Sequence, residues 1–191
     1  DTRRDIAIAV NALRRHYRLD PLPEAVIAGY VGDGVRKLVE RAIRDADLDL
    51  EEALTVQRRY YREHLLDTAT LYPGVADGLR TLHAQGYRLA VATNKLVEFT
   101  ERLLTHFQLR PLFTCVRGDG NSPSFKPDPA TLLAILRETG SSPDLSWVIG
   151  DHHTDLEAGR RAGLRRIFVA WGIGHPGGET PEATVHTFPE L

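Results

Sequence analysis

Residues 147–155 read Trp-Val-Ile-Gly-Asp-His-His-Thr-Asp, a short apolar run that passes directly into a polar turn. A run of this length that ends at Gly predicts a buried β-strand, and an amphipathic helix is expected after it, around 155–162. Similar runs at 87–92, 113–116 and 167–170 alternate with helical patterns around 75–85, 96–107 and 128–139. Strands that alternate with helices indicate βαβ units, so the fold class is α/β with a Rossmann-like parallel sheet.

The first third of the chain has a different pattern and predicts helices alone. Ile6, Val10, Leu13 and Tyr17 recur at three-to-four spacing, which places one apolar stripe on a helix. Further helical pieces follow, from Val35 to Ile43 among others, until the turn at Tyr72-Pro73-Gly74. We therefore expect an all-helical subdomain at 1–72 and an α/β core at 73–191.

Composition and charge narrow the range of partners. The 191 residues are 42% apolar and 26% charged, with a formal net charge of -2, which provides no positive field for nucleic acid or an anionic membrane. No apolar stretch approaches the roughly 20 residues of a membrane-spanning helix. The single Cys115 excludes an internal disulfide and fits a reducing cytoplasm. A monomer or a homodimer is expected.

Polar residues follow the first two strands of the predicted core. Thr93-Asn94-Lys95 offers a hydroxyl and backbone N–H groups at a strand-to-helix turn, which suits phosphate oxygens, although helix capping uses the same residues. Lys126-Pro127-Asp128-Pro129 offers a point positive charge from Lys126, with Asp128 placed to cap the next helix. Alone, this second motif is equally an exposed lysine before a helix that starts with proline.

The third strand is followed by two carboxylates. Asp151 leaves the strand end, and Asp155 opens the next helix, so both can face one point. Mg²⁺ uses one or two carboxylates and keeps several waters, which makes it the expected ion. The alternative for Asp155 is an ordinary helix N-cap. The pair His152-His153 does not predict a zinc site, because adjacent side chains diverge and no Cys or spaced third His completes a tetrahedral set.

Taken in order, Thr-Asn, Lys-Pro-Asp-Pro and Gly-Asp-x-x-x-Asp resemble the second, third and fourth motifs of the haloacid-dehalogenase superfamily. The segment from Gly29 to Ala42 looks like the cap of phosphoglycolate phosphatases within that superfamily. Tyr72-Pro73-Gly74-Val75 looks like the return from cap to core. The resemblance covers nearly the whole chain and implies a core that carries an inserted, mobile helical cap.

The resemblance also implies roles for particular residues of the core. Thr93 would bond the phosphoryl oxygens with help from backbone N–H groups around Asn94, and Lys126 would neutralise the nucleophile and the phosphoryl charge. Asp151 would bind Mg²⁺ directly, with Asp155 supporting it.

In the cap, the loop from Gly32 to Gly34 would close over substrate. Gly32 and Gly34 are therefore candidate substrate-binding residues, together with Arg36 and Lys37, which would meet the non-phosphoryl end.

The implied activity is Mg²⁺-dependent hydrolysis of a small phosphorylated metabolite, with 2-phosphoglycolate as the leading candidate. In the superfamily, the first Asp of an Asp-x-Asp-Gly-Thr motif attacks phosphorus to form an aspartyl-phosphate, and the second Asp is the general acid and base. Residues 1–191 contain no such motif. Asp1-Thr2 looks like its continuation, so we expect the nucleophile and a central strand before residue 1, and no activity without them.

Other readings stay open at the level of sequence. An inactive pseudo-phosphatase that binds a phosphorylated ligand is the alternative outside enzymes. A β-phosphoglucomutase-like, pyrophosphatase-like or dehalogenase enzyme is the alternative within them, and the two carboxylates favour phosphoryl over halide chemistry.

Overall fold

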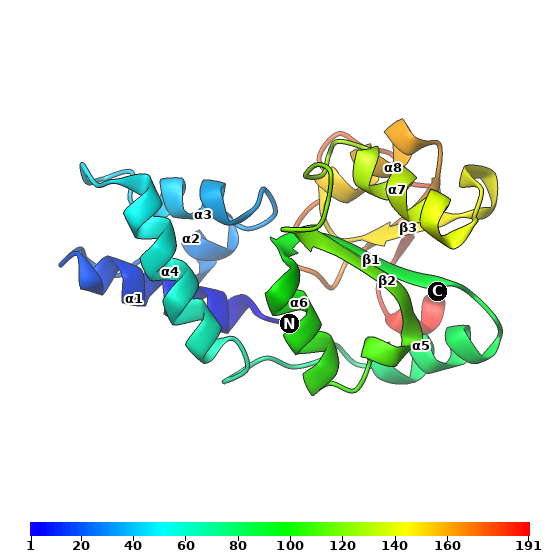
Figure 1. Ribbon diagram of the computed structural model, residues 1–191, viewed down its shortest axis with the longest axis horizontal. Coiled ribbons are helices and arrows are strands. Elements are labelled where there is room, and N and C mark those ends of the chain that lie inside the picture. Colours follow the sequence, from blue (N-terminus) through cyan, green and yellow to red (C-terminus); the bar gives the residue numbers. More distant parts are fainter. The chain divides into compact units, whose positions relative to one another are not determined.

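A computed structural model describes residues 1–191 as two compact units, Asp1–Thr70 and Leu71–Leu191 (Figure 1). The first unit contains helices only, and the second alternates strands with helices. The sequence places the corresponding change of structure after residue 72. None of the helices combines the length and the apolar composition needed to cross a membrane.

The first unit is built from four helices, and α1 supplies one wall of its core. The helices are α1 (Arg3–His16), α2 (Glu24–Ala28), α3 (Val35–Ala42) and α4 (Leu50–His64). Leu13 of α1 is fully buried against a cluster from the other helices, which comprises Val39, Ile43, Ala53, Leu54 and Val56. Burial of each large apolar side chain contributes about 1.5–3 kcal/mol. The apolar stripe seen in the sequence is thus the packed face of α1.

A buried arginine ties α1 to the segment after α3. Only 3% of the Arg14 side chain is exposed, and its Nη1 and Nη2 donate to the two carboxylate oxygens of Asp45 at 2.9 and 2.7 Å. Its other donors bond the carbonyl oxygens of Asp20 and Ala42. The buried guanidinium is therefore satisfied from three sides, as a buried charge must be.

The second unit contains four α-helices and five strands, which alternate along most of the chain. In chain order the main elements are α5 (Val75–Ala84), β1 (Leu89–Leu96), α6 (Val97–His106), β2 (Phe113–Asp119), α7 (Ala130–Thr139), β3 (Trp147–Gly150), α8 (His153–Ala162), β4 (Arg165–Val169) and β5 (Ala183–Val185). Short 3₁₀ turns lie at Arg110–Leu112, Pro143–Leu145 and Phe188–Glu190. All strand pairs are parallel, which confirms the predicted α/β class.

The strands form two separate sheets. β1 pairs with β2, and β3, β4 and β5 follow one another in the second sheet (Figure 1). Parallel sheets are normally covered on both faces. Here Trp147 and Ile149 of β3 are 44% and 47% exposed, and α5 contributes no buried residue. β3 is thus less covered than a strand inside a complete parallel sheet would be.

Helices α7 and α8 cover the other face of β3. Leu132 and Leu136 of α7 are buried against Ala158 and Ala162 of α8, in pairs spaced by one helical turn. Gly159 lets α8 approach the sheet, since a Cβ there would lie 2.8 Å from Val148 Cγ1. This packing sets the position of the first turn of α8, where the polar residues of 151–155 lie.

The predicted end of the first strand is wrong. The sequence ends that strand at Ala92 and places Thr93-Asn94-Lys95 in a turn, whereas β1 continues to Leu96 and α6 begins at once. Ala92 and Leu96 are paired with residues only two apart on β2, so residues 93–95 stand opposite Gly118 alone. The two extra residues form a bulge, which still re-aims the polar side chains at the strand end.

Gly118 makes room for this bulge. A Cβ on Gly118 would lie 2.6 Å from the carbonyl oxygen of Lys95 and 3.2 Å from Thr93 Cγ2. Any side chain at this position would push the bulge away from β2. The glycine is therefore part of what places Thr93 and Asn94.

Candidate active site

Lys126 stands between the two sheets of the second unit. Its Nζ donates to the carbonyl oxygen of Ala92 at 2.6 Å and to Asp155 Oδ1 at 2.5 Å. The side chains of Lys126 and Asp155 are only 11% and 12% exposed. A buried charge needs a paired and hydrogen-bonded partner. The lysine thus joins the end of β1 to the first turn of α8.

Asn94 holds the backbone of Lys126. Its Nδ2 donates to the Lys126 carbonyl oxygen at 2.9 Å, and its Oδ1 accepts from the Lys126 N–H at 2.8 Å. Asn94 is 7% exposed. The sequence analysis expects backbone N–H groups near Asn94 to assist phosphate binding. In the structure, the Asn94 side chain holds the backbone of Lys126. These two hydrogen bonds fix the backbone of Lys126 and thereby help to place its ammonium group.

Thr93 lies in the bulge of β1 with its hydroxyl close to the backbone that follows. Its Oγ1 accepts a hydrogen bond from the Lys95 N–H at 3.1 Å. A hydroxyl that accepts one bond can still donate its own proton. Thr93 can therefore offer an O–H donor to an oxygen of a bound ligand.

Asp151 follows β3 and is held by a loop that comes after β4. Its Oδ2 accepts from the N–H of Ile173 at 2.7 Å and of Gly174 at 3.2 Å. Within the chain, no hydrogen bond or ion pair engages Oδ1 of the same carboxylate. One oxygen is thus fixed by backbone donors while the other is available to a ligand.

Asp155 lies in the first turn of α8, but it does not open the helix as the sequence predicts. The helix begins at His153 with His152 as N-cap, because His152 Nδ1 accepts from the Thr154 N–H and Asp155 accepts in return from the His152 N–H. This reciprocal arrangement is a capping box. Asp155 Oδ2 is used by this bond at 3.1 Å, and Oδ1 by Lys126. Both oxygens of Asp155 are therefore engaged within the protein.

The two carboxylates differ in what they can do for a metal ion. No group of three or more His, Cys, Asp or Glu side chains in residues 1–191 is arranged to hold one. Mg²⁺ needs no such cage, because it keeps several waters and uses one or two carboxylates. The unengaged Oδ1 of Asp151 fits that requirement. Asp155 fits an outer position, from which it supports Lys126.

Comparisons with known proteins identify the family of the chain. The sequence model of the family described as "Haloacid dehalogenase-like hydrolase" matches residues 1–169. The chain belongs to this family. It is 38% identical over 193 residues to a phosphoglycolate phosphatase of Chromobacterium violaceum, covering 98% of this chain and 87% of that one. It is 30% identical over 185 residues to a phosphoglycolate phosphatase of Aquifex aeolicus, covering 97% and 86%.

Solved structures share the fold of this haloacid dehalogenase-like hydrolase. A protein of Haemophilus somnus described as a predicted phosphoglycolate phosphatase superposes with a TM-score of 0.93 at 26% identity, covering 99% of this chain and 89% of that one. CbbY of Rhodobacter sphaeroides, solved in complex with phosphate, superposes with a TM-score of 0.81 at 22% identity, covering 100% and 90%. The second likeness concerns the fold alone.

Three imidazoles of the hydrolase gather beside Asp151. The ring of His152 lies 4.1 Å from that of His153 and 5.8 Å from that of His175, measured between centroids. His152 and His175 each accept a backbone N–H at Nδ1, from Thr154 and Gly177. These bonds leave Nε2 as the donor nitrogen of both neutral rings. His152 and His175 can thus each offer an Nε2–H donor.

The predicted substrate-binding residues belong to the other unit, Asp1–Thr70. Gly32 and Gly34 adopt φ values of 126° and 87°, which glycine tolerates far better than other residues, and Gly34 precedes α3. Arg36 and Lys37 on α3 form exposed ion pairs with Glu51 and Glu40. Exposed pairs contribute about 0–1 kcal/mol, so both cations can exchange their partners at low cost.

Sequence reasoning missed the loop that holds Asp151. Residues 171–178 follow β4 and supply the two N–H donors described above. A signal was present in the spacing of Gly172, Gly174 and Gly177 directly after a predicted strand. Glycines so placed allow a close backbone approach. That approach is what brings the loop onto Asp151.

Proposed function

We propose that this hydrolase is a Mg²⁺-dependent phosphatase for a small phosphorylated metabolite, with 2-phosphoglycolate as the first candidate. The observation that carries the proposal is the buried Lys126–Asp155 pair next to Asp151, whose Oδ1 has no partner in the chain. This arrangement combines a fixed cation with an available carboxylate oxygen. The phosphoglycolate phosphatases at 30% and 38% identity support the choice of substrate.

Four residues of the candidate active site have separate parts in the proposed reaction. Lys126 offsets negative charge at the phosphoryl group, and Asn94 fixes the backbone from which it extends. Thr93 donates its hydroxyl proton to a phosphoryl oxygen. Asp151 holds the metal ion through Oδ1. When bound, Mg²⁺ supplies positive charge that stabilises the developing charge on the transferred group.

The proposal includes an aspartyl-phosphate intermediate, formed on the first Asp of the superfamily's Asp-x-Asp-Gly-Thr motif. A carboxylate oxygen of the first Asp would attack phosphorus while the ester oxygen leaves with a proton from the second Asp. Water, which gives a proton to the second Asp, would then attack the same phosphorus, releasing inorganic phosphate and regenerating both carboxyl groups. The separate β1–β2 and β3–β4–β5 sheets, with Ile149 half exposed, support a further strand between them.

Hydrolysis assays on the natural full-length protein test the proposal. We expect phosphate release from 2-phosphoglycolate, chosen from a panel of phosphorylated metabolites, that requires Mg²⁺ and is abolished in Asp151→Ala. Binding of these compounds without turnover would contradict it and favour a phospho-ligand binding module. Preferential interconversion of hexose phosphates or cleavage of pyrophosphate would instead favour the other enzyme classes.

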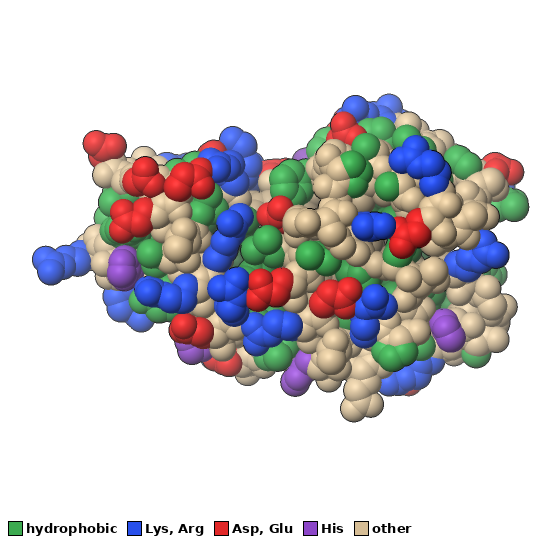
Figure 2. Space-filling view, viewed as in Figure 1, with side chains coloured by type: hydrophobic (Ala, Val, Ile, Leu, Met, Phe, Trp, Pro, Cys, Tyr) green, Lys and Arg blue, Asp and Glu red, His purple; other side chains and the backbone are tan.

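The proposed setting is a cytoplasmic monomer or homodimer without nucleic-acid or membrane partners. Cys115 is a free, buried thiol, which suits a reducing compartment. Figure 2 shows Lys and Arg interspersed with Asp and Glu on the visible face, with no single basic patch. Light scattering on the purified protein measures the oligomeric state.

A further inference from the structure

The loop at 171–178 packs closely against residues 151–153. A Cβ on Gly172 would lie 2.1 Å from Asp151 Cβ, and one on Gly174 would lie 2.5 Å from His152 Cδ2. A Cβ on Gly177 would lie 2.9 Å from His153 Cβ. Real Cβ atoms do not approach so closely. Three glycines of the loop thus face three successive residues of the site.

This contact controls the orientation of the Asp151 carboxylate. The loop donates two N–H groups to Oδ2, and both come from consecutive residues, Ile173 and Gly174. The paired donors hold Oδ2 in place and leave Oδ1 without a partner in the chain. Outer donors of this kind orient a metal ligand and are commonly as important as the ligand's own identity.

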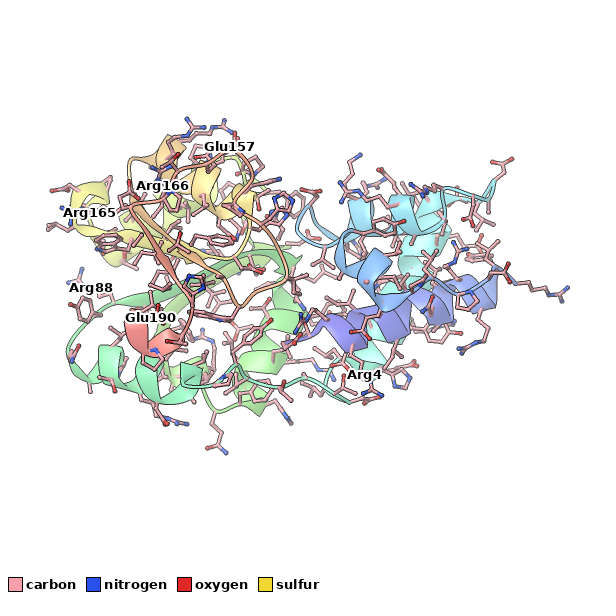
Figure 3. The ribbon with its side chains drawn as sticks, turned by 180° about the vertical axis from the view of Figure 1, so that it is seen from behind. Arg4, Arg88, Glu157, Arg165, Arg166 and Glu190 are labelled. Atoms are coloured by element: carbon pink, nitrogen blue, oxygen red, sulfur yellow. The ribbon has the colours of Figure 1, made fainter.

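The far end of the loop is anchored by Glu179. Its carboxylate accepts from Arg160 of α8 at 3.1 Å and from Arg166 of β4 at 3.0 Å, and 15% of its side chain is exposed. Arg166 extends from β4 beside α8 (Figure 3), where Gly159 makes room for its side chain. The hydrogen bond from Arg160 lowers the pKa of the Glu179 carboxyl, so the anchor stays ionised. The Glu179 N–H also bonds the carbonyl oxygen of Pro176, which ties the anchor to the loop.

We propose that Glu179 is a positioning residue that acts on metal binding through the loop at 171–178. It holds the loop so that the N–H groups of Ile173 and Gly174 keep Asp151 Oδ1 turned toward the ion. This inference rests on the proposed function, because it takes Asp151 as the metal ligand.

A matched pair of glycine variants tests the role of the loop. Gly172→Ala places a methyl group on Asp151, whereas a Cβ on Gly178 meets nothing within 4 Å. We expect Gly172→Ala to weaken Mn²⁺ binding, titrated by electron paramagnetic resonance on the full-length protein, roughly ten- to a hundredfold. Gly178→Ala should bind Mn²⁺ as the parent does. Equal Mn²⁺ affinity in both variants would overturn the role of the loop.

A matched pair of glutamate variants tests the role of Glu179. This test adds no methyl group to the loop. Glu179 and Glu182 both bond Arg166, but only Glu179 is joined to the loop. We expect Glu179→Gln to raise the Mn²⁺ dissociation constant about tenfold. Glu182→Gln should leave it unchanged, even if both variants lower the melting temperature of the metal-free protein.

The outcomes separate this inference from the function on which it rests. Unchanged Mn²⁺ affinity in Glu179→Gln, with a parent protein that binds Mn²⁺ and loses it in Asp151→Ala, overturns the positioning role alone. Equal losses in Glu179→Gln and Glu182→Gln also overturn it, since they indicate a general effect on stability. A parent protein that binds no Mn²⁺ overturns both the metal site and the inference.

Discussion

The Lys126 ammonium nitrogen lies 2.5 Å from Asp155 Oδ1, and both side chains are nearly buried. The same nitrogen bonds the carbonyl oxygen of Ala92, so the pair links the end of β1 with the first turn of α8. Because Ala92 lies in β1 and Asp155 lies in α8, the two bonds of Lys126 tie a strand of one sheet to the helix that packs on the other sheet.

Replacing one member of this pair should destabilise the protein. Lys126→Met leaves the Asp155 carboxylate buried without its cation, which costs about 3–5 kcal/mol for pairs of this kind. Urea denaturation measures the free energy of unfolding. Lys126→Met/Asp155→Asn should recover part of the loss without restoring phosphatase activity. Lys37→Met removes an exposed lysine and should change the free energy of unfolding by less than about 1 kcal/mol. Equal effects of the two single lysine replacements would contradict the importance of the buried pair.

Asp151→Asn should separate metal binding from folding. The side-chain amide oxygen of Asn can still accept from the N–H groups of Ile173 and Gly174, but the position loses its negative charge. We expect the melting temperature of the metal-free protein to be nearly unchanged, and Mg²⁺ affinity by calorimetry to fall more than roughly tenfold. A variant that binds Mg²⁺ normally would remove Asp151 from the metal site.

Gly118→Ala should disturb the end of β1 that carries Thr93 and Asn94. The added methyl group meets the Lys95 carbonyl oxygen at 2.6 Å, so the bulge that carries Thr93 must shift. Overpacking of this kind costs about 1–3 kcal/mol. We expect a lower free energy of unfolding together with a raised KM for the phosphorylated substrate. Gly178→Ala is the control and should change stability by less than about 0.5 kcal/mol. Normal KM and stability in Gly118→Ala would show that the bulge tolerates a side chain.

The helical unit should lose stability in acid through Asp45. The hydrogen bond from Arg14 lowers the pKa of the Asp45 carboxyl to about 2, from 3.8. A carboxyl whose pKa is lower when folded contributes stability that is complete above the unfolded pKa and is lost as the pH falls through the folded one. Asp45→Asn should therefore flatten the fall of unfolding free energy between about pH 4 and pH 2. The free energy of unfolding is measured by urea denaturation at several pH values. If it falls as steeply in Asp45→Asn as in the parent between these pH values, Asp45 does not cause the loss of stability in acid.

Much of the fold follows from local patterns in the sequence. The apolar stripe of Ile6, Val10 and Leu13 predicts α1 because a helix repeats its faces every 3.6 residues. The runs at 113–116 and 147–149 predict β2 and β3 for a similarly local reason. The three-residue strand β5 was missed, because its residues, from Ala183 to Val185, are too few to form a pattern.

The sequence by itself determined the order of the polar motifs, the α/β class and the family, since these depend on residue type and spacing along the chain. Only the tertiary structure decided which oxygens are engaged. It pairs Asp155 with Lys126 and leaves Oδ1 of Asp151 available, and it brings the loop at 171–178 against residue 151. These are contacts between residues more than twenty positions apart, which arise from strand register and helix packing. Local periodicity carries no information about them.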